Sequence, residues 1–413
     1  MENFDVIIIG AGLAGLSLGS ELSKKHNILV IEKGQIKKEH KTWTTEEAIV
    51  RDAGLEQFIS VRFDKCYFKF LNKDKFYLYD KAVTVDDKAI LNFFEKTIKN
   101  NQSKIMENCD FLDIAEKNDS HLTIKTKKGV FSTRLLIDCS GVDSTLTTRY
   151  KLYNKIFYYP VYGGIYDVSL KNKDIYIGEI MTSDYPINWL ETFPITENQT
   201  LIYTFQYLKE SIDPKVLKPI HQYQIKNCYL KNELKGKKMV REVYGVIPMG
   251  EVKKTAVDNI FFFGDTDLIG SPLAGSGFTN IIQHYKKIAE HISNNLTKNT
   301  LKEKDLNYTF SKIEQINRDI QTIIGLILIN AKSKQVGLFF DMLKTFPNKV
   351  IVDTIFLRLT IEEIALLIKT LVEKFGFKQL ASILPKKEYM FVAQEALKTI
   401  EDITIEEIEE IFN

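Results

Sequence analysis

A glycine-rich stretch near the N-terminus restricts the possible folds of this chain more than any other feature. The apolar, β-branched run Asp5–Ile9 reads as a buried parallel strand and leads directly into Gly10, Gly12 and Gly15. Apolar residues at helical spacing follow over Leu16–Lys24. This order of strand, glycine turn and helix is typical of the first half of a dinucleotide-binding βαβ unit.

Each glycine of the turn has its own expected role. Gly10 permits the tight turn out of the strand, Gly12 lets a pyrophosphate approach the backbone, and Gly15 lets the helix pack against the sheet. Leu13 and Ala14 open the helix, whose free N–H groups and dipole attract phosphates. We therefore expect these residues to contact the cofactor.

A second strand and an acidic residue complete the unit. Ile28–Ile31 is apolar and ends at Glu32, which is followed by Lys33. Glu32 lies ~20 residues beyond the glycine turn, where a carboxylate accepts hydrogen bonds from a ribose. An acid without a neighbouring arginine disfavours a 2′-phosphate, so FAD and NAD both remain open at this point.

Later stretches that end in glycine decide for FAD. One predicted strand ends in Asp138-Cys-Ser-Gly141, and another apolar run ends in Gly264-Asp265, where a carboxylate suits a second ribose or ribitol. Gly275 and Gly277, followed by Phe278, open a second helix over Ile281–Leu296. Its N-terminus can face the pyrophosphate or the flavin ring. No second GxGxxG follows a strand, so a separate nicotinamide-binding fold is not indicated.

The pairing of these motifs resembles the FAD domain shared by geranylgeranyl reductases, aromatic hydroxylases and lycopene cyclases. Four further stretches are similar to the lycopene cyclase branch: His40–Trp43, Tyr244–Gly250, Gly337–Asp341 (which contains the Phe339-Phe340 pair) and Phe356–Thr360. The resemblance implies FAD as the cofactor. It also implies that Trp43 packs near the flavin or the substrate, with a core tryptophan as the alternative.

The predicted fold class is α/β, with a discontinuous Rossmann-type FAD-binding domain, an inserted antiparallel or mixed β-sheet and a C-terminal helical region. We assign residues 1–65, 83–150 and 245–300 to the FAD domain, 66–82 and 151–244 to the substrate sheet, and 301–413 to a helical cap. Alternating residues predict the strands of the inserted sheet, which are Ile165–Leu170, Asp174–Met181, Asn188–Phe193 and Leu201–Tyr207.

The resemblance also implies a reaction. Lycopene cyclases use reduced FAD without net redox change, while an acid protonates a terminal alkene of a polyene. The family carries an acidic pair where this chain has Tyr203 and Thr204. Glu179, Glu191 and Tyr203 are the candidate catalytic residues, and the alternative for each acid is the solvent face of the sheet.

We expect an FAD-dependent enzyme that cyclises or isomerises a large apolar substrate of the isoprenoid or carotenoid type. A redox enzyme, either a double-bond reductase or a monooxygenase, is the first alternative. A flavoprotein that binds lipid without chemistry is the second. The expected partners are the apolar substrate and an external electron donor such as NAD(P)H or a reductase.

Composition excludes other classes of function. The net charge of +2 and the scattered lysines do not favour nucleic acid. Four cysteines without close spacing, and His284 and His291 without a third ligand, indicate no metal site. The longest apolar run, Ile323–Ile329, is too short to span a membrane. We expect a cytoplasmic protein whose helices could rest on a membrane surface.

Overall fold

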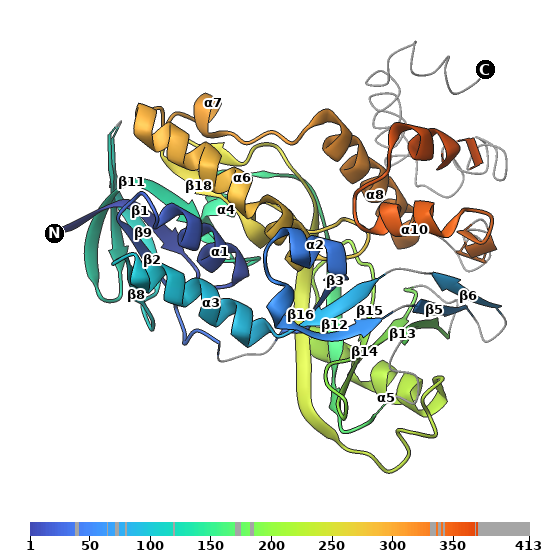
Figure 1. The fold of residues 1–413 in the computed structure, drawn as a ribbon. Helices are drawn as coiled ribbons and strands as arrows, with labels where there is room; N and C mark the ends of the chain where they lie inside the picture. Colours follow the sequence, from blue (N-terminus) through green and yellow to red (C-terminus); the bar gives the residue numbers. More distant parts are fainter. Residues whose placement is uncertain are drawn as a thin grey trace.

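A computed structural model describes residues 1–37, 41–63, 65–70, 74–78, 81–118, 120–169, 175–181, 186–330, 336–337, 340–341, 343–367 and 369–370. Within them, strands form an eight-stranded, a seven-stranded and a three-stranded sheet. Figure 1 shows the N-terminal helices beside the first sheet and the C-terminal helices near the far end of the second.

The first sheet has the Rossmann arrangement, which confirms the predicted α/β fold class. Parallel neighbours follow in the order β18-β11-β1-β2-β8, and β17 adds an antiparallel edge. The strands are β1 (Glu2–Ile9), β2 (Ile28–Ile31), β8 (Lys104–Met106), β11 (Gly129–Asp138), β17 (Ala256–Val257) and β18 (Ile260–Phe262), and β9 (Phe111–Lys117) and β10 (Leu122–Thr126) extend β11. The carboxyl ends of β1, β11 and β18 meet at one edge of the sheet.

Both faces of this sheet are apolar. Successive side chains of a strand point to opposite faces, and in β1 the side chains on both faces are apolar. Val6 and Ile8 of β1 pack into the core beneath three helices, whereas Ile7 and Ile9 pack into the opposite core with Leu146. The three helices are α1 (Leu13–Leu22), α3 (Asp87–Asn100) and α6 (Gly277–Lys298), and the opposite core includes α4 (Thr145–Arg149). Asp86 caps α3 by accepting from Ala89 N at 2.9 Å.

The second sheet is mixed, as the sequence predicts. Its order is β16-β12-β15-β14-β13-β5-β6, and all neighbours are antiparallel except β13 and β5. The strands are β5 (Lys65–Phe70), β6 (Asp74–Leu78), β12 (Tyr153–Tyr166), β13 (Ile175–Ile180), β14 (Trp189–Pro194), β15 (Thr200–Phe205) and β16 (Met239–Val252).

Two details of this sheet differ from the prediction. The strand expected over Ile165–Leu170 is instead the end of the 14-residue β12, which stops at Tyr166. Aromatic residues on both faces of β12 hide the alternation on which the prediction relied. The domain boundary proposed between residues 244 and 245 falls inside β16, a strand of the second sheet that also packs against the loop at Gly275.

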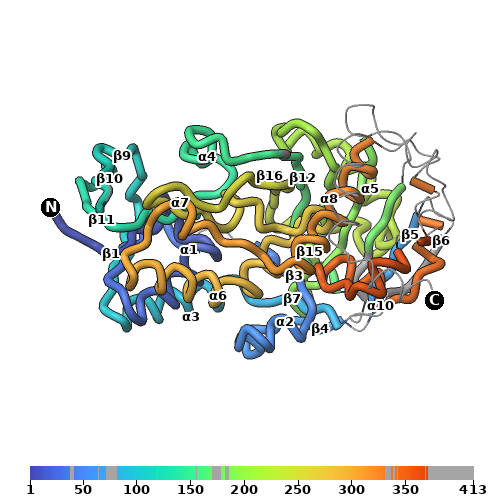
Figure 2. Tube along the Cα trace, turned by 90° about the horizontal axis from the view of Figure 1, so that it is seen from above, coloured from blue at the N-terminus to red at the C-terminus, as the bar shows by residue number. Residues whose placement is uncertain are grey.

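Helices cover both faces of the second sheet. α5 (Lys218–Asn227) and η2 (Pro214–Leu217) lie on one face, and α8 (Lys312–Asn330) and α10 (Asn348–Ile355) pack into the apolar cluster on the other. The small sheet β3-β7-β4, made of β3 (Trp43–Glu46), β4 (Ile59–Phe63) and β7 (Ala82–Val85), adjoins α2 (Glu47–Asp52) and η1 (Glu56–Phe58). In Figure 2 it lies between the two larger sheets.

The described part of the predicted helical cap is helical. It contains α7 (Glu303–Leu306), α8 and α10, and a further helical segment starts after Thr360, which shares a reciprocal capping box with Glu363. The predicted extension through 371–413 lies outside the described residues. Within the part that the structure describes, the helices are too short or too polar to cross a bilayer.

Candidate functional site

Three turns meet at the carboxyl edge of the Rossmann sheet. A Cβ added to Gly10 would lie 2.4 Å from the carbonyl oxygen of Cys139, and one added to Gly264 would lie 2.7 Å from the Cβ of Ala14. Both glycines have positive φ, +96° and +93°. Only glycine permits these close approaches, so the turns after β1, β11 and β18 form one cradle.

Open space borders two glycines of this cradle. A Cβ on Gly12 or on Gly141 would meet no atom within 4 Å, whereas one on Gly15 would lie 1.9 Å from the carbonyl oxygen of Gly10. Gly12 is the N-cap of α1, and Leu13 and Ala14 follow it as buried residues. The free N–H groups of this helix end therefore face a space that a pyrophosphate can enter.

Glu32 lies beside the cradle at the end of β2. Its Oε2 accepts from Ala11 N at 2.8 Å and its Oε1 accepts from Gly34 N at 2.9 Å. The carboxylate thus holds the first glycine turn as well as lying where a ribose hydroxyl is expected. Lys33 is exposed at the next position.

The second glycine loop, Gly264–Gly277, closes the cradle from the other side. A Cβ on Gly277 would lie 3.6 Å from Oδ1 of Asp265, and burial raises the pKa of Asp265, with the charge of Lys41 opposing this. Burial also raises the pKa of Asp267 to about 8. The loop therefore brings the side chain of Asp265 close to Gly277, the first residue of α6.

A strand of the second sheet supports this loop. Gly275 has φ +62°, and a Cβ there would lie 3.5 Å from Cδ1 of Ile247 and 3.9 Å from the sulfur of Met249. Both side chains belong to the stretch of β16 that is similar to lycopene cyclases. The stretch therefore forms the floor of the loop that is expected to face the flavin.

Helix α8 fastens the same loop, which the sequence did not predict. Arg318 donates to the carbonyls of Leu268 and Ile269 at 2.7 and 3.0 Å. Oε1 of Gln321 accepts from Ser271 Oγ at 2.5 Å and from Leu273 N at 3.2 Å.

Gly325 allows α8 to approach closely, since a Cβ there would lie 3.1 Å from the carbonyl oxygen of Pro272. The spacing of Arg318, Gln321 and Gly325 puts all three on one face of the helix. Two polar residues and a glycine on one face of an otherwise apolar helix are the sequence pattern from which this contact could have been predicted.

Trp43 stacks on Phe278, with ring centroids 5.0 Å apart and an interplanar angle of 10°. The neighbouring Thr45 and Thr279 hydroxyls are 2.8 Å apart. β3 is therefore fixed against the N-terminal turn of α6. A contact between Trp43 and the flavin stays a prediction, and His40 lies outside the described residues.

Glu191 and Tyr203 form a hydrogen-bonded pair on the face of the second sheet that packs against α8. They are direct partners in the register of β14 and β15, and the Tyr203 hydroxyl donates to Oε2 of Glu191. Burial, and then the neighbouring Glu191 carboxylate, raise the pKa of Tyr203 well above its usual value. Gly163 and Gly178 flank the pair in the same row of the sheet.

The same face carries aromatic rings and reaches the second glycine loop. Phe205 stacks on Tyr159 at 4.1 Å and on Trp189 at 5.7 Å between ring centroids. The hydroxyl of Tyr207 donates to the carbonyl of Leu273 at 2.6 Å. The face that carries Glu191 and Tyr203 is therefore joined to the second glycine loop through Tyr207.

Glu179 lies on the opposite face of the sheet. It is 3% exposed, and its two oxygens accept from the backbone N–H of Tyr229, after α5, at 3.1 and 3.0 Å. Burial raises its pKa, while this hydrogen bond and Lys69, 3.7 Å away, lower it. The structure thus separates the two candidate acids that the sequence grouped together.

Comparison with known proteins gives a family and a fold. The family model described as lycopene cyclase protein matches residues 5–376. A geranylgeranyl bacteriochlorophyll reductase-like protein of Thermoplasma acidophilum superposes with a TM-score of 0.72 at 14% identity, over 93% of this chain and 100% of that chain. None of the curated protein sequences matches this chain significantly.

Two further solved structures share the fold. A flavoprotein/dehydrogenase of Cytophaga hutchinsonii has a TM-score of 0.67 at 14% identity, over 94% of this chain and 99% of that chain. The p-nitrophenol 4-monooxygenase of Pseudomonas putida has a TM-score of 0.61 at 15% identity, over 91% and 99%. The family match, this fold and the open glycine cradle confirm the predicted branch, the fold class and FAD as the cofactor.

Proposed function

We propose the function of this chain from one established fact: the chain belongs to the lycopene cyclase protein family. It is an FAD-dependent enzyme with the fold of flavoprotein oxidoreductases. Its reaction, in our proposal, is the cyclisation or isomerisation of a large apolar polyene of the isoprenoid or carotenoid type, without net redox change.

The Glu191–Tyr203 pair carries this proposal. Where lycopene cyclases have an acidic pair, this chain has Tyr203 and Thr204, so the acid must come from another strand. Glu191 brings a carboxyl group to the side of Tyr203 from the neighbouring β14. We therefore assign the role of general acid to Glu191, with Tyr203 orienting it.

The proposed reaction balances without an oxidant or a reductant being consumed. Glu191, in its carboxylic acid form, transfers a proton to a terminal alkene carbon of the polyene. The resulting cation forms one new C–C bond to a nearby double bond and then loses a proton to the Glu191 carboxylate. The product has the mass of the substrate, and the acid is regenerated.

The surroundings of the pair suit a cationic intermediate. The apolar cluster that contains Trp189 and Tyr207 excludes water that would trap a cation. When bound, reduced FAD supplies negative charge that stabilises the cation electrostatically. Glu179 has no such role here, because it holds the turn at Tyr229 on the other face.

The test supplies the FAD-loaded chain with lycopene and a reductant under anaerobic conditions. The proposal expects an isomer of the substrate, which Glu191→Gln reduces strongly and Glu179→Gln does not. A wild-type chain that forms no isomer would refute cyclase chemistry with this substrate. An unchanged rate in Glu191→Gln would refute the assignment of the acid.

A redox reaction on an apolar molecule is the second candidate. It is favoured by the absence of the family's acidic pair and by the fold shared with a reductase-like protein and a monooxygenase. It requires an external donor such as NAD(P)H or a reductase. Stoichiometric consumption of NAD(P)H or oxygen would establish it, whereas bound lipid without any turnover would indicate a carrier.

The substrate's solubility suggests how it reaches the protein. We propose that the chain takes its polyene from a membrane surface through peripheral contact. Cosedimentation of the FAD-loaded chain with vesicles that contain the polyene is expected, and an equal distribution with and without vesicles would contradict this.

A further inference from the structure

Exposed hydrophobic side chains gather on the side of the second sheet that α5 covers. Ten large hydrophobic side chains are exposed in the part of the chain that the structure describes, and half of them lie between residues 216 and 244. These five are Val216 of η2, Tyr223 of α5, Tyr229, Val240 and Tyr244. Single exposed apolar residues are ordinary, but a concentration of them marks an interaction surface.

These side chains belong to adjacent elements. The ammonium group of Lys215 lies 4.5 Å from the ring centroid of Tyr244, so η2 rests against the start of β16. Helix α5 follows η2 directly and turns the buried His221 toward the sheet, which leaves Tyr223 on its outer side. In Figure 1, α5 lies on the side of the second sheet away from α8 and α10. We call the exposed side chains of residues 209–244 the α5 surface.

The α5 surface is strongly basic. Residues 209–244 contain nine lysines and arginines and four acidic residues, in a chain whose net charge is +2. Lys218 lies 3.5 Å from Oε1 of Glu242. Five further lysines are exposed and have no ion pair within the described residues, and these are Lys226, Lys231, Lys235, Lys237 and Lys238.

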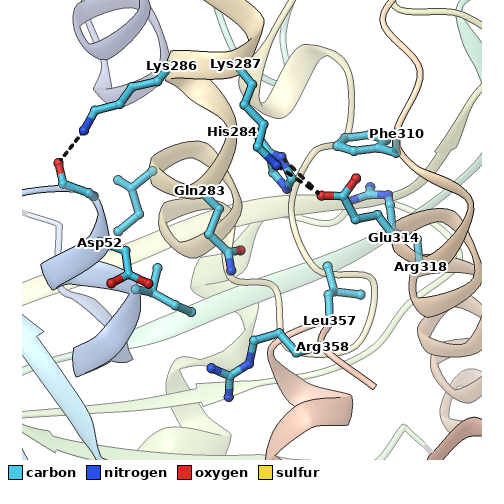
Figure 3. Close-up of a pocket in the computed structure, with 13 residues that line it drawn as sticks. Asp52, Gln283, His284, Lys286, Lys287, Phe310, Glu314, Arg318, Leu357 and Arg358 are labelled. Carbon is cyan, nitrogen blue, oxygen red and sulfur yellow. Dashed lines mark hydrogen bonds and ion pairs between the residues drawn. The ribbon is translucent and has the colours of Figure 1, made fainter. Parts of the chain in front are cut away.

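Cations elsewhere in the molecule are neutralised by the protein itself. Around the cavity between α2 and α6, Lys286 donates to the carbonyl of Ala53 at 3.0 Å, and Lys287 lies 3.8 Å from Oε1 of Glu314 (Figure 3). The five lysines of the α5 surface have no such partners, so their charge is directed to the solvent. The surface therefore favours an anionic partner.

We propose that the α5 surface docks on a lipid bilayer that is rich in anionic phospholipids. Tyrosine rings favour the interface of a bilayer, where the ring is sheltered and the hydroxyl stays hydrated. Lysines near an anionic bilayer each add roughly fivefold to the affinity. Because the lysines and tyrosines are spread over η2, α5 and the segment that leads to β16, they suit a fluid surface whose headgroups rearrange around them.

Docking in this way brings one end of the second sheet to the lipid. The segment after α5 enters β16 at Met239, which pairs with Tyr166 at the end of β12. In the neighbouring strands, Phe193 and Leu201 form an apolar cluster against which Tyr203 packs, and the rings of Phe193 and Tyr203 stack at 5.4 Å. This cluster joins the end of the sheet to the proposed acid. A role in supplying the polyene rests on the proposed function, whereas the docking itself does not.

The experiment measures cosedimentation of the FAD-loaded chain with vesicles that contain no polyene. One set is phosphatidylcholine alone, and the other is equal parts of phosphatidylcholine and phosphatidylglycerol. The anionic vesicles should bind at least tenfold more tightly, and this binding should weaken as the salt concentration rises, because salt screens the charges. Equal distribution with and without anionic vesicles would overturn the proposal and leave an acidic protein as the partner to be sought.

A matched pair of variants localises the binding. Tyr223→Ser combined with Lys226→Glu changes an exposed ring and an exposed lysine three residues apart on α5, and should weaken binding to anionic vesicles about tenfold or more. Phe93→Ser combined with Lys96→Glu makes the same change on the exposed face of α3 and should bind like the wild type. FAD content and melting temperature report the folding of each variant. Equal weakening in both would refute the α5 surface as the docking face.

Turnover separates the docking from the chemistry. With polyene dissolved in detergent, the α5 variant should match the wild type, whereas with polyene in anionic vesicles it should be slower. A chain that binds anionic vesicles but forms no isomer would refute the proposed function and keep the docking surface. A chain that converts dissolved polyene but ignores the vesicles would refute the docking surface and keep the proposed function.

Discussion

The Tyr207 hydroxyl donates a 2.6 Å hydrogen bond to the carbonyl of Leu273, and this bond joins the substrate sheet to the second glycine loop. Tyr207 follows β15, the strand that carries Tyr203, and Leu273 is held from the other side by Gln321. The proposed acid and the loop that we expect to face the cofactor are thus parts of one connected framework. Function is expected to depend on this framework as well as on the acid itself.

Removing the acid should separate catalysis from folding. Glu191→Gln keeps the size of the side chain and its place on β14 but cannot supply the proton, so turnover should fall about 10²–10⁴-fold. Tyr203→Phe, which removes only the orienting hydroxyl, should cost less. Turnover per bound FAD is the measurement.

Glu179→Gln is the matched control, since Glu179 lies on the opposite face against Tyr229. It should lower the free energy of unfolding while turnover per bound FAD stays near that of the wild type. A loss of turnover in Glu179→Gln as large as that in Glu191→Gln would contradict the assignment.

Two glycines of the first turn should respond to alanine in different ways. Gly12→Ala adds a Cβ into open space, so the chain should fold normally but bind FAD about tenfold or more weakly. Gly15→Ala places a Cβ 1.9 Å from the carbonyl oxygen of Gly10 and should lower the melting temperature itself. FAD titration and thermal unfolding without added FAD measure both effects. Normal FAD affinity in Gly12→Ala would argue against a pyrophosphate at this turn.

The buried network around His221 should make stability depend on pH. Thr204 donates to Gln224 at 2.6 Å, so its hydroxyl oxygen accepts from His221 Nδ1, while the Tyr166 hydroxyl donates to Nε2. This network requires a neutral imidazole, and burial lowers the pKa of His221 from 6.5 to about 4.

Because the unfolded chain binds this proton first, the contribution of His221 is complete above pH 6.5 and is lost as the pH falls toward 4. The loss should total about 3 kcal/mol. Denaturant unfolding of the wild type and of His221→Gln at pH 7 and pH 4.5 isolates the contribution of His221 to the free energy of unfolding. Identical pH slopes in the two proteins would exclude this account.

Asp267 should make stability depend on pH in the opposite direction. Its folded pKa is raised by burial to about 8 from 3.8, so the unfolded chain loses the proton first and stability declines as the pH rises from 4 to 8. Asp267→Asn removes this dependence. The variant should therefore gain stability relative to the wild type as the pH increases, which unfolding at pH 5 and pH 8 would measure. A gap between the two proteins that stays constant with pH would contradict a raised pKa.

Local patterns predicted the cofactor half of the molecule well. A strand that ends in glycine directly before a helix is compatible with few structures other than a nucleotide-binding turn. For this reason β1, α1, β2 and the Gly264–Gly277 loop could be placed from their residues. The length of β12 could not, because its aromatic residues fill both faces of the sheet and remove the polar alternation that defines a strand's ends.

The substrate half depends on pairing between distant strands. The sequence identified Glu179 and Glu191 as candidate acids, but a shift of one residue in register moves a side chain to the other face. The pairing of β14 with β15 places Glu191 beside Tyr203, and the pairing of β13 with β14 puts Glu179 on the opposite face of the sheet. The fastening of the flavin loop by Arg318 and Gln321 is likewise a tertiary contact across some fifty residues of chain.

The most direct test of the central claim is the mass and electron balance of a single anaerobic turnover. The chain, loaded with FAD and reduced beforehand, is mixed with a polyene, and both the product and the flavin spectrum are recorded. We predict a product of unchanged mass, flavin that remains reduced, and loss of this product in Glu191→Gln. A product heavier by two hydrogens with oxidised flavin would contradict the account and establish a reductase.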